Sequence, residues 1–135
     1  MIEVAQTTDS AEIEAWISRP FMVRMVPGVK NIPPGVRYQE IGTVLRVTSF
    51  GTLCGFFLLL GHGPARELHT SLATFGSLTM QAGMAMKEWC SKNGISRLVT
   101  KYPSRHKTLL GLAGMLGFII INVSDGWVES EMEIP

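Results

Sequence analysis

The sequence of 135 residues predicts one domain of the mixed α/β (α+β) class. Two stretches carry this prediction. Leu78 to Phe118 has the pattern of a helix, a short strand and a second helix, and Val36 to Ala73 has that of three strands in a meander. A strand–helix–strand crossover requires parallel strands, with the helices lying on the sheet. The expected order is strand, helix, three-strand meander, helix, strand, helix, strand.

Composition and charge exclude several classes of protein. The chain is 46% hydrophobic and 17% charged, which is typical of a globular domain, and its net charge of +1 gives no general attraction to nucleic acid or anionic membrane. Met1-Ile2-Glu3 lacks the features of a secretory signal, and Gly55 interrupts the longest apolar run, Leu53 to Leu60. We expect a soluble intracellular protein in a reducing cytoplasm, with Cys54 and Cys90 as reduced, buried thiols.

The N-terminal part begins with a predicted strand, Ile2 to Ala5. Asp9-Ser10-Ala11-Glu12 has the form of a capping box, so a helix should follow it to about Ser18. Its buried residues should be Ile13, Trp16 and Ile17. The pattern of Phe21 to Val26 fits either a short helix or a strand. Pro27 to Gly35 is rich in proline and glycine and predicts a loop, a candidate lid or partner-binding edge.

The meander should consist of Tyr38 to Ser49, Leu53 to Leu60 and Arg66 to Ala73. Phe50-Gly51-Thr52 predicts a tight hairpin connection, and the middle strand is apolar on both faces and therefore central. In the third strand, alternation places two sets of side chains on opposite faces. One face has Leu68, Thr70 and Leu72, and the other has Glu67, His69 and Ser71.

The helix after the meander has an apolar stripe, and Asn93-Gly94 supplies a left-handed stop. The stripe consists of Leu78, Ala82, Ala85 and Trp89, and we expect Met80 and Met84 to fill the core beside it rather than form a recognition surface. Ile95 to Tyr102 should be a strand and Lys107 to Leu116 a helix. Gly111 and Gly114 in that helix indicate either close packing on the sheet or room for a ligand. Gly126 to Ile134 alternates acidic and apolar residues, which suggests an edge strand with an acidic outer face.

The stretch from Glu67 to Phe118 resembles the acetyl-CoA-dependent N-acetyltransferase (GNAT) superfamily. The strand to Ala73, the helix to Cys90 and the strand from Ile95 resemble its motif A, and His106 to Phe118, with the Gly117-Phe118 ending, resembles motif B. The resemblance implies a mixed, mostly antiparallel, twisted sheet of about six strands, with three or four helices on both faces.

Acetyl-CoA is the cofactor that this resemblance implies. The family holds the CoA pyrophosphate on backbone amides at a helix N-terminus. The candidate cofactor-binding residues here are Leu72, Ala73, Phe75, Gly76, Ser77, Leu78 and His106. The family's basic residue and closely spaced glycines are absent from the loop, where only Gly76 remains, so binding would depend on the main chain.

Glu67 and His69 are the candidate catalytic residues, as a general base and its orienting partner. A hydrogen-bonded structural pair is the alternative for these two side chains. Ala113 stands where many family members have a tyrosine that protonates the departing thiolate, and His106 replaces an asparagine of the family. No spacing of cysteine and histidine predicts a metal site.

Two short runs, Glu67-Leu68-His69-Thr70 and Lys101-Tyr102-Pro103, are similar to small proteins of tailed phages, some of which act in head assembly of short-tailed phages. The first functional hypothesis is therefore a non-catalytic, GNAT-fold accessory or chaperone in assembly of a virion's head or ejection apparatus. Its partners would be phage structural or ejection proteins, and its location the host cytoplasm or the virion itself. The alternative is an active N-acetyltransferase on an unidentified amine.

A basic cluster is a third feature, with three conceivable ligands: the CoA phosphate, nucleic acid or an acidic protein segment. It consists of Arg97, Lys101, Arg105 and Lys107. Apart from Tyr102, no aromatic residue is interleaved with these charges, so nucleic-acid binding is not favoured. The sequence also gives no reason to expect a membrane partner.

Overall fold

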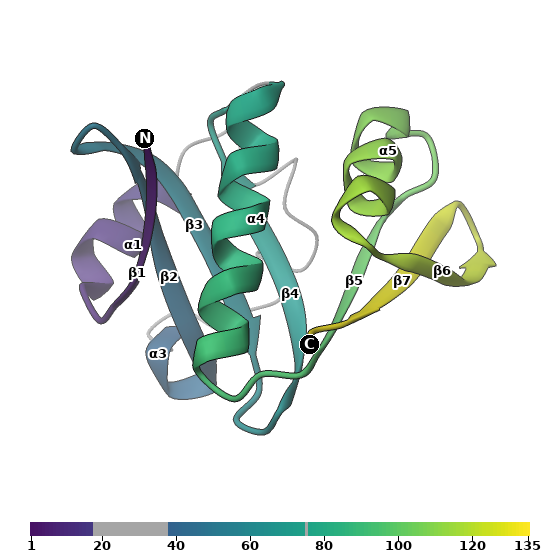
Figure 1. The fold of residues 1–135 in the computed structure, drawn as a ribbon, viewed down its shortest axis with the longest axis horizontal. Helices are drawn as coiled ribbons and strands as arrows, with labels where there is room; N and C mark the ends of the chain where they lie inside the picture. The colour runs from purple at the N-terminus through teal and green to yellow at the C-terminus, as the bar shows by residue number, and fades with distance from the viewer. Residues whose placement is uncertain (18–37, 75) are drawn as a thin grey trace.

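The computed structural model describes residues 1–17, 38–74 and 76–135, in which seven strands form one sheet of order β1-β2-β3-β4-β5-β7-β6 (Figure 1). The strands are β1 (Ile2–Thr7), β2 (Gly42–Ser49), β3 (Thr52–Leu60), β4 (Ala65–Leu72), β5 (Arg97–Pro103), β6 (Ile119–Ser124) and β7 (Trp127–Glu133). The helices are α1 (Ser10–Ile17), α3 (Tyr38–Ile41), α4 (Ser77–Lys92) and α5 (Lys107–Leu116). All neighbouring strands are antiparallel except β4 and β5. The predicted fold class is confirmed.

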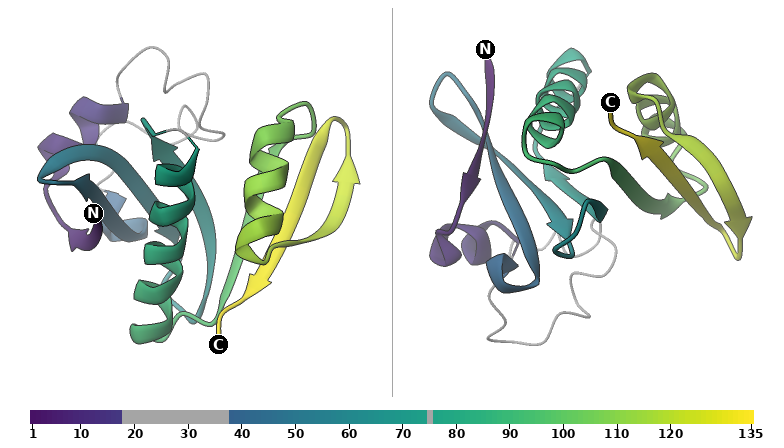
Figure 2. Two further views of the ribbon diagram at one scale, coloured as in Figure 1. Left: turned by 45° about the horizontal axis from the view of Figure 1, so that its top comes forward. Right: turned by 60° about the horizontal axis from the view of Figure 1, so that its bottom comes forward.

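Two layers of helices cover the sheet, with α4 and α5 on one face and α1 and α3 on the other (Figure 2). Each face has its own core. The core beneath α4 joins the helix residues Ala82, Met86 and Cys90 to strand residues such as Leu59 and Leu98. The smaller core beneath α1 consists of Ile13, Trp16, Val44 and Phe56. The predictions for Phe21 to Val26, Pro27 to Gly35 and Phe75 lie outside the described residues.

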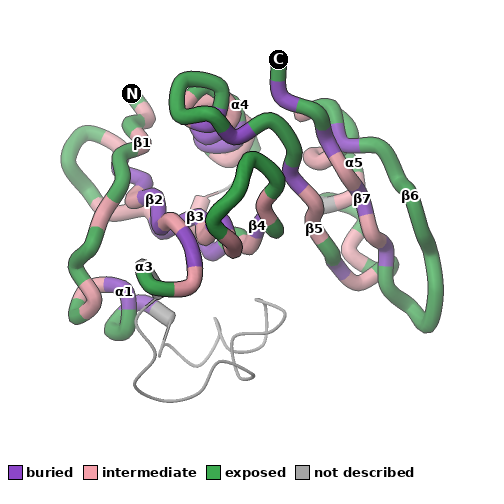
Figure 3. Tube along the Cα trace, turned by 90° about the horizontal axis from the view of Figure 1, so that it is seen from below, coloured by how far each residue is buried: buried purple, intermediate pink, exposed green. Residues whose placement is uncertain are grey.

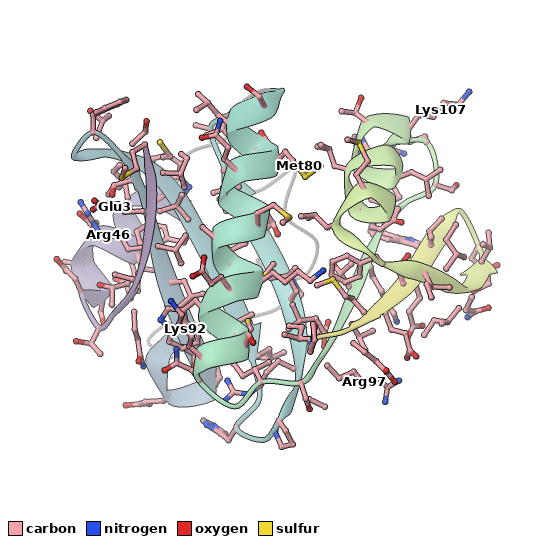
Figure 4. The ribbon with its side chains drawn as sticks, in the orientation of Figure 1. Glu3, Arg46, Met80, Lys92, Arg97 and Lys107 are labelled. Carbon is pink, nitrogen blue, oxygen red and sulfur yellow. The ribbon has the colours of Figure 1, made fainter. Side chains whose placement is uncertain are left out.

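Helix α1 begins where the capping sequence predicts. The backbone N–H of Glu12 donates a hydrogen bond of 3.1 Å to Asp9 Oδ1, which is one half of the capping box. The Glu12 carboxylate does not return to the helix start but accepts a 2.6 Å bond from Arg46 Nε on β2. In Figure 4, Arg46 accordingly lies beside α1. This ion pair links α1 to β2, next to the buried contact that Ile13 and Trp16 make with the sheet.

The predicted strand from Tyr38 was wrong in its first four residues, which form the single turn α3. Strand β2 begins at Gly42 because its antiparallel partner β3 ends opposite it, at Leu60. Among the described residues, no strand pairs with Tyr38 to Ile41, and the carbonyl of Ile41 instead accepts a hydrogen bond of 2.9 Å from the N–H of Gly61.

The β2–β3 hairpin turns at Phe50 and Gly51, whose φ angles are 51° and 80°, as predicted for a tight connection. Two glycines let neighbouring strands approach. A Cβ added at Gly42 would lie 2.3 Å from the carbonyl oxygen of Leu59, and one at Gly55 would lie 2.0 Å from that of Ser71. Gly55 also follows a β-bulge in β3 and has a φ of 139°, which favours glycine.

Helix α4 ends where Asn93-Gly94 predicts, with Gly94 at a φ of 76°. Its buried face consists of Ala82, Gly83, Met86 and Cys90. The expected core role of Met84 was wrong, since 52% of that residue is exposed, and Leu78 in the predicted stripe is 39% exposed. The sheet lies under the 82–86–90 side of the helix, so side chains two residues away from Met86 point outward.

Helices α4 and α5 touch through a close approach at Gly83, where an added Cβ would lie 2.7 Å from Leu116 Cδ1. Lys87 Nζ donates a 3.0 Å bond to the carbonyl of Leu116, at the α5 C-terminus. Gly117 ends α5 in the left-handed region, with a φ of 109°, as its position predicts. Of the two alternatives left open for Gly111 and Gly114, the structure does not support close packing, because a Cβ at either would meet nothing within 4 Å.

The C-terminal strand was predicted at the edge of the sheet, and this was wrong. Strand β7 lies between β5 and β6, and β6 is the edge strand. Strand β6 was not predicted. It pairs with β7 through a turn at Asp125 and Gly126, which have φ angles of 52° and 80°. The alternation itself was correct, since Val128, Ser130 and Met132 are buried between more exposed neighbours.

Met86 is fully buried between α4 and the sheet, so Met86→Ala should leave a cavity and lower the free energy of unfolding by about 2–5 kcal/mol. Met84→Ala on the exposed side of the same helix is the matched control and should stay within about 0.5 kcal/mol of the wild type. Urea unfolding followed by circular dichroism measures both. Equal effects of the two substitutions would contradict the orientation of α4.

Burial raises the pKa of the Cys90 thiol to about 11 from an ordinary value of 9.0. The unfolded chain then loses this proton at lower pH than the folded chain, so the free energy of unfolding should fall as pH rises from about 9 to about 11. Urea unfolding between pH 8 and 11 tests this against Cys90→Ala, which removes the group. The difference between the two pH profiles isolates Cys90; parallel profiles would refute its contribution.

Candidate functional site

Strands β4 and β5 separate after a short parallel stretch. Only Ala65 to Glu67 pair with Arg97 to Val99, although β4 continues to Leu72 and β5 to Pro103. On its other side, β4 pairs with β3, and β5 pairs with β7. Each strand therefore stays in its own part of the sheet. Figures 1 and 2 show the two strands diverging from there. The candidate site is built around this divergence.

Thr100 occupies the first position of β5 beyond the paired residues. Its hydroxyl donates a hydrogen bond of 3.1 Å to the carbonyl of Leu68 on β4. A side chain thereby satisfies a backbone acceptor where the ladder between the strands has ended. No sequence pattern marks Thr100, because its role depends on the register between two strands that a helix separates in the chain.

Glu67 and His69 lie on β4 at the divergence, on the face away from α4. The register places His69 opposite Leu58 and Ser71 opposite Phe56, whose side chain belongs to the core under α1. His69 Nε2 is 3.2 Å from Glu67 Oε1, and the two side chains are 21% and 47% exposed. The alternation of β4 predicted this shared face, and the structure brings the two residues together. Their catalytic role stays a prediction.

Helix α1 borders the same face through Trp16. Its indole Nε1 donates a hydrogen bond of 2.9 Å to Ser71 Oγ, two residues along β4 from His69. The Trp16 ring also packs edge-on against Phe56, with centroids 6.1 Å apart. Burial of Trp16 was predicted, but its bond to Ser71 joins residues 55 positions apart and could not be.

Five of the predicted cofactor-binding residues lie where β4 ends and α4 begins. Leu72 ends the strand, Gly76 is the N-cap residue with a φ of 56°, and Ser77 and Leu78 open the helix. Ala73 follows the strand and its N–H donates a 2.8 Å bond to the carbonyl of Cys54. No side chain caps the start of α4, so its first N–H groups are available to an anion.

His106 is the N-cap residue of α5 and makes no side-chain capping bond. Helices α4 and α5 start at the same end of the molecule (Figure 1), although Lys107 projects away from α4 in Figure 4. Ala113 is half-buried against the core beneath α4. The Tyr102 hydroxyl lies 3.0 Å from Ser130 Oγ, and both residues are buried.

The basic cluster is partly neutralised. Arg97 forms an ion pair with Glu131, and Lys101 is opposite Glu129 in the register of β5 and β7. Figure 4 shows Arg97 at the opposite end of the molecule from Lys107, so the four residues do not form one patch. In the part of the chain that the structure describes, no group of three or more potential metal ligands gathers. No helix of these residues is long and apolar enough to cross a membrane.

No family model and no curated protein matches this sequence. Solved structures, by contrast, match along the whole chain. A Bacillus subtilis acetyltransferase in complex with CoA has a TM-score of 0.76 at 14% identity, with complete coverage of both chains. A Streptococcus pneumoniae acetyltransferase of the GNAT family gives 0.75 at 13%, again with complete coverage of both. The Campylobacter jejuni N-acetyltransferase PseH in complex with acetyl coenzyme A gives 0.66 at 13%, with both chains fully covered.

Thr100→Val keeps the shape of the side chain and removes the hydrogen bond to Leu68, so we expect the free energy of unfolding to fall by about 1 kcal/mol. Thr108→Val, at an exposed position of α5, is the control and should change it by less than about 0.5 kcal/mol. Chemical denaturation of the two variants provides the comparison. A neutral Thr100→Val variant would mean that the bond does not hold the strands at their divergence.

Proposed function

We propose, on the premise that this chain has the GNAT acetyltransferase fold, that it is an acetyl-CoA-dependent N-acetyltransferase acting on a primary amine. One observation carries the proposal. The divergence of β4 and β5 has the Glu67–His69 pair on one face and the start of α4 beyond the end of β4. Strand β4 thus carries the proposed proton acceptor and leads into the helix start that would bind the anion. The acetyltransferases of this fold crystallised with CoA or acetyl-CoA support the choice of cofactor.

The CoA pyrophosphate would bind to the main chain at the start of α4. Gly76, Ser77 and Leu78 contribute this backbone, after Leu72 and Ala73, whose N–H already bonds Cys54. The predicted set also includes Phe75 and His106. The helix start carries a partial positive charge and free N–H donors, which together favour an anion. A Cβ at Gly76 would meet nothing within 4 Å, so the backbone there is open to a ligand. The loop needs no basic side chain for this mode of binding.

Glu67 and His69 would accept the proton of the attacking amine. With the Nε2 proton directed at Glu67, Nδ1 of His69 carries the free lone pair. The amine nitrogen attacks the thioester carbonyl carbon and forms the new C–N bond, and the C–S bond breaks as the tetrahedral species collapses. The proton lost by nitrogen passes to His69, and Glu67 stabilises the resulting imidazolium.

The departing thiolate needs a proton from another source. Ala113 cannot supply it, and the hydroxyl of Tyr102 is buried beside Ser130. We therefore propose that solvent water protonates the sulfur. A CoA thiol is acidic enough to leave as the anion, so the lack of a dedicated acid slows this step less than loss of the base would slow attack.

A non-catalytic function is the second candidate. Ala113 and the absence of a basic residue from Thr74 to Thr79 favour it, since both are losses relative to the family. The hypothesis of phage head or ejection-apparatus assembly has no support among the matching solved structures, which are acetyltransferases. The two candidates differ in whether an amine is acetylated.

Substitution of the base separates them. Glu67→Gln and His69→Gln should each lower kcat about 10²-fold or more while the Kd for acetyl-CoA stays within about threefold, because neither side chain belongs to the proposed cofactor loop. Release of CoA thiol, measured across a panel of amines and N-terminal peptides, gives kcat, and isothermal titration gives Kd. His62→Gln, in the exposed β3–β4 turn, is the histidine control and should resemble the wild type.

Absence of acetyl-CoA binding by the folded wild-type protein would overturn the proposal and favour the non-catalytic function. Binding of acetyl-CoA without release of CoA thiol in the presence of any amine in the panel would also favour the non-catalytic function. Full activity of both Glu67→Gln and His69→Gln would refute the role of the pair.

A further inference from the structure

Strand β6 is exposed along its whole length. Figure 3 shows it as a continuous green segment, and each of its six residues is exposed. Four of them are large and apolar: Ile119 is 70% exposed, Ile120 48%, Ile121 46% and Val123 61%. On the neighbouring strand β7, Trp127 lies opposite Ser124 and is 42% exposed. Such a concentration of aliphatic side chains on one strand is unlike the scattered apolar residues of an ordinary surface.

The same strand has an unpartnered edge. β6 is the last strand of the sheet formed by the described residues, so the backbone groups on its outer side have no strand to pair with. Exposed edges are commonly protected by a charge, a proline or a β-bulge. β6 has a bulge but neither a charge nor a proline, and its remaining residues are Asn122 and Ser124. The edge is thus suited to pairing with another strand.

A bulge between Ile120 and Asn122 determines which side chains share a face. Ile120 is opposite Ser130 and Val123 is opposite Val128, and both of these β7 residues are buried on one face of the sheet. Without the extra residue, Ile120 and Val123 would point to opposite faces. With it, both lie on the same face, three positions apart.

We propose that β6 pairs antiparallel with β6 of a second copy of this chain, about a two-fold axis at the centre of the strand. This register places Ile120 of each copy opposite Val123 of the other, an aliphatic pair at two symmetric positions. It also places Asp125, the charged residue that follows the strand, opposite Phe118 of the second copy and not opposite its own equivalent. No like charges therefore meet along the paired strands.

The size of the surface fits a dimer. At their exposed fractions, the four β6 side chains and Trp127 together present on the order of 500 Å² of apolar surface over the two faces of the strand, against ~300–600 Å² for the largest single patch of a monomer. A standard interface buries ~800 Å² per partner. Pairing of the strand edges would add the backbone, Asn122 and Ser124 to the apolar side chains. A second copy is the occupant that this composition fits, because the strand is complementary to itself.

Sedimentation velocity of the full chain from about 1 to 100 μM tests the pairing. The wild type should be a dimer in this range. Ile120→Lys with Val123→Lys puts like charges opposite each other twice and should weaken the dimer roughly 100-fold or more. Ile120→Lys with Val123→Glu puts opposite charges at the same two positions and should retain the dimer better than the double-lysine variant by at least tenfold.

Met84→Lys is the matched control for loss of exposed apolar surface. Met84 lies on α4 in a separate groove, which also includes Met80 and Ile134, and the variant should remain dimeric. Circular dichroism must show that each variant is folded. A monomeric wild type at 100 μM overturns the proposal, as does a dimer that both double variants leave intact. Equal weakening by the two double variants overturns the register.

Discussion

Three parallel residue pairs between β4 and β5 connect the two parts of the sheet. β4 is otherwise held by β3 and β5 by β7, each along most of its length, so the two strands separate without losing their antiparallel partners. Beyond Glu67 and Val99 their facing edges are not paired with each other, and Thr100 supplies one substitute bond to Leu68. Backbone groups at such a position need a partner, and a ligand with amide groups provides one. The proposed chemistry depends on this limited pairing more than on any single side chain.

The two long helices bridge this division. Helix α4 packs on a core with residues from both parts of the sheet, such as Leu59 on β3 and Leu98 on β5, and it contacts α5 at Gly83, Lys87 and Leu116. Both helices begin at the same end of the molecule, so the positive ends of their dipoles lie on the same side. A loop that has no basic residue between Thr74 and Thr79 can still lie in a positive field. The absence of a basic side chain therefore leaves in place the physical basis on which the proposed anion binding depends.

Local signals in the sequence predicted most of the elements, and the errors have identifiable causes. Asn93-Gly94 and Gly117 ended helices as expected because glycine alone adopts those backbone angles readily. Strand β6 was missed because Ile119 to Val123 has no period-2 alternation, although Asp125-Gly126 is a strong hairpin signal. The shared face of Glu67 and His69 followed from alternation. The Thr100–Leu68 and Trp16–Ser71 bonds depend on which strands become neighbours, and a single sequence does not contain that information.

The glycines at 42 and 55 affect how loss of function should be interpreted. Each lies where the carbonyl of an adjacent strand occupies the space of a side chain, and Gly55 is close to the β4 backbone that carries Ser71. Any replacement of Gly55 forces β3 and β4 apart and shifts β4, the strand that carries Glu67 and His69. Loss of activity in a Gly55 variant would consequently reflect the altered spacing of β3 and β4. In a scan of every position, intolerance at these two sites should not be counted as evidence for a catalytic or ligand-binding role.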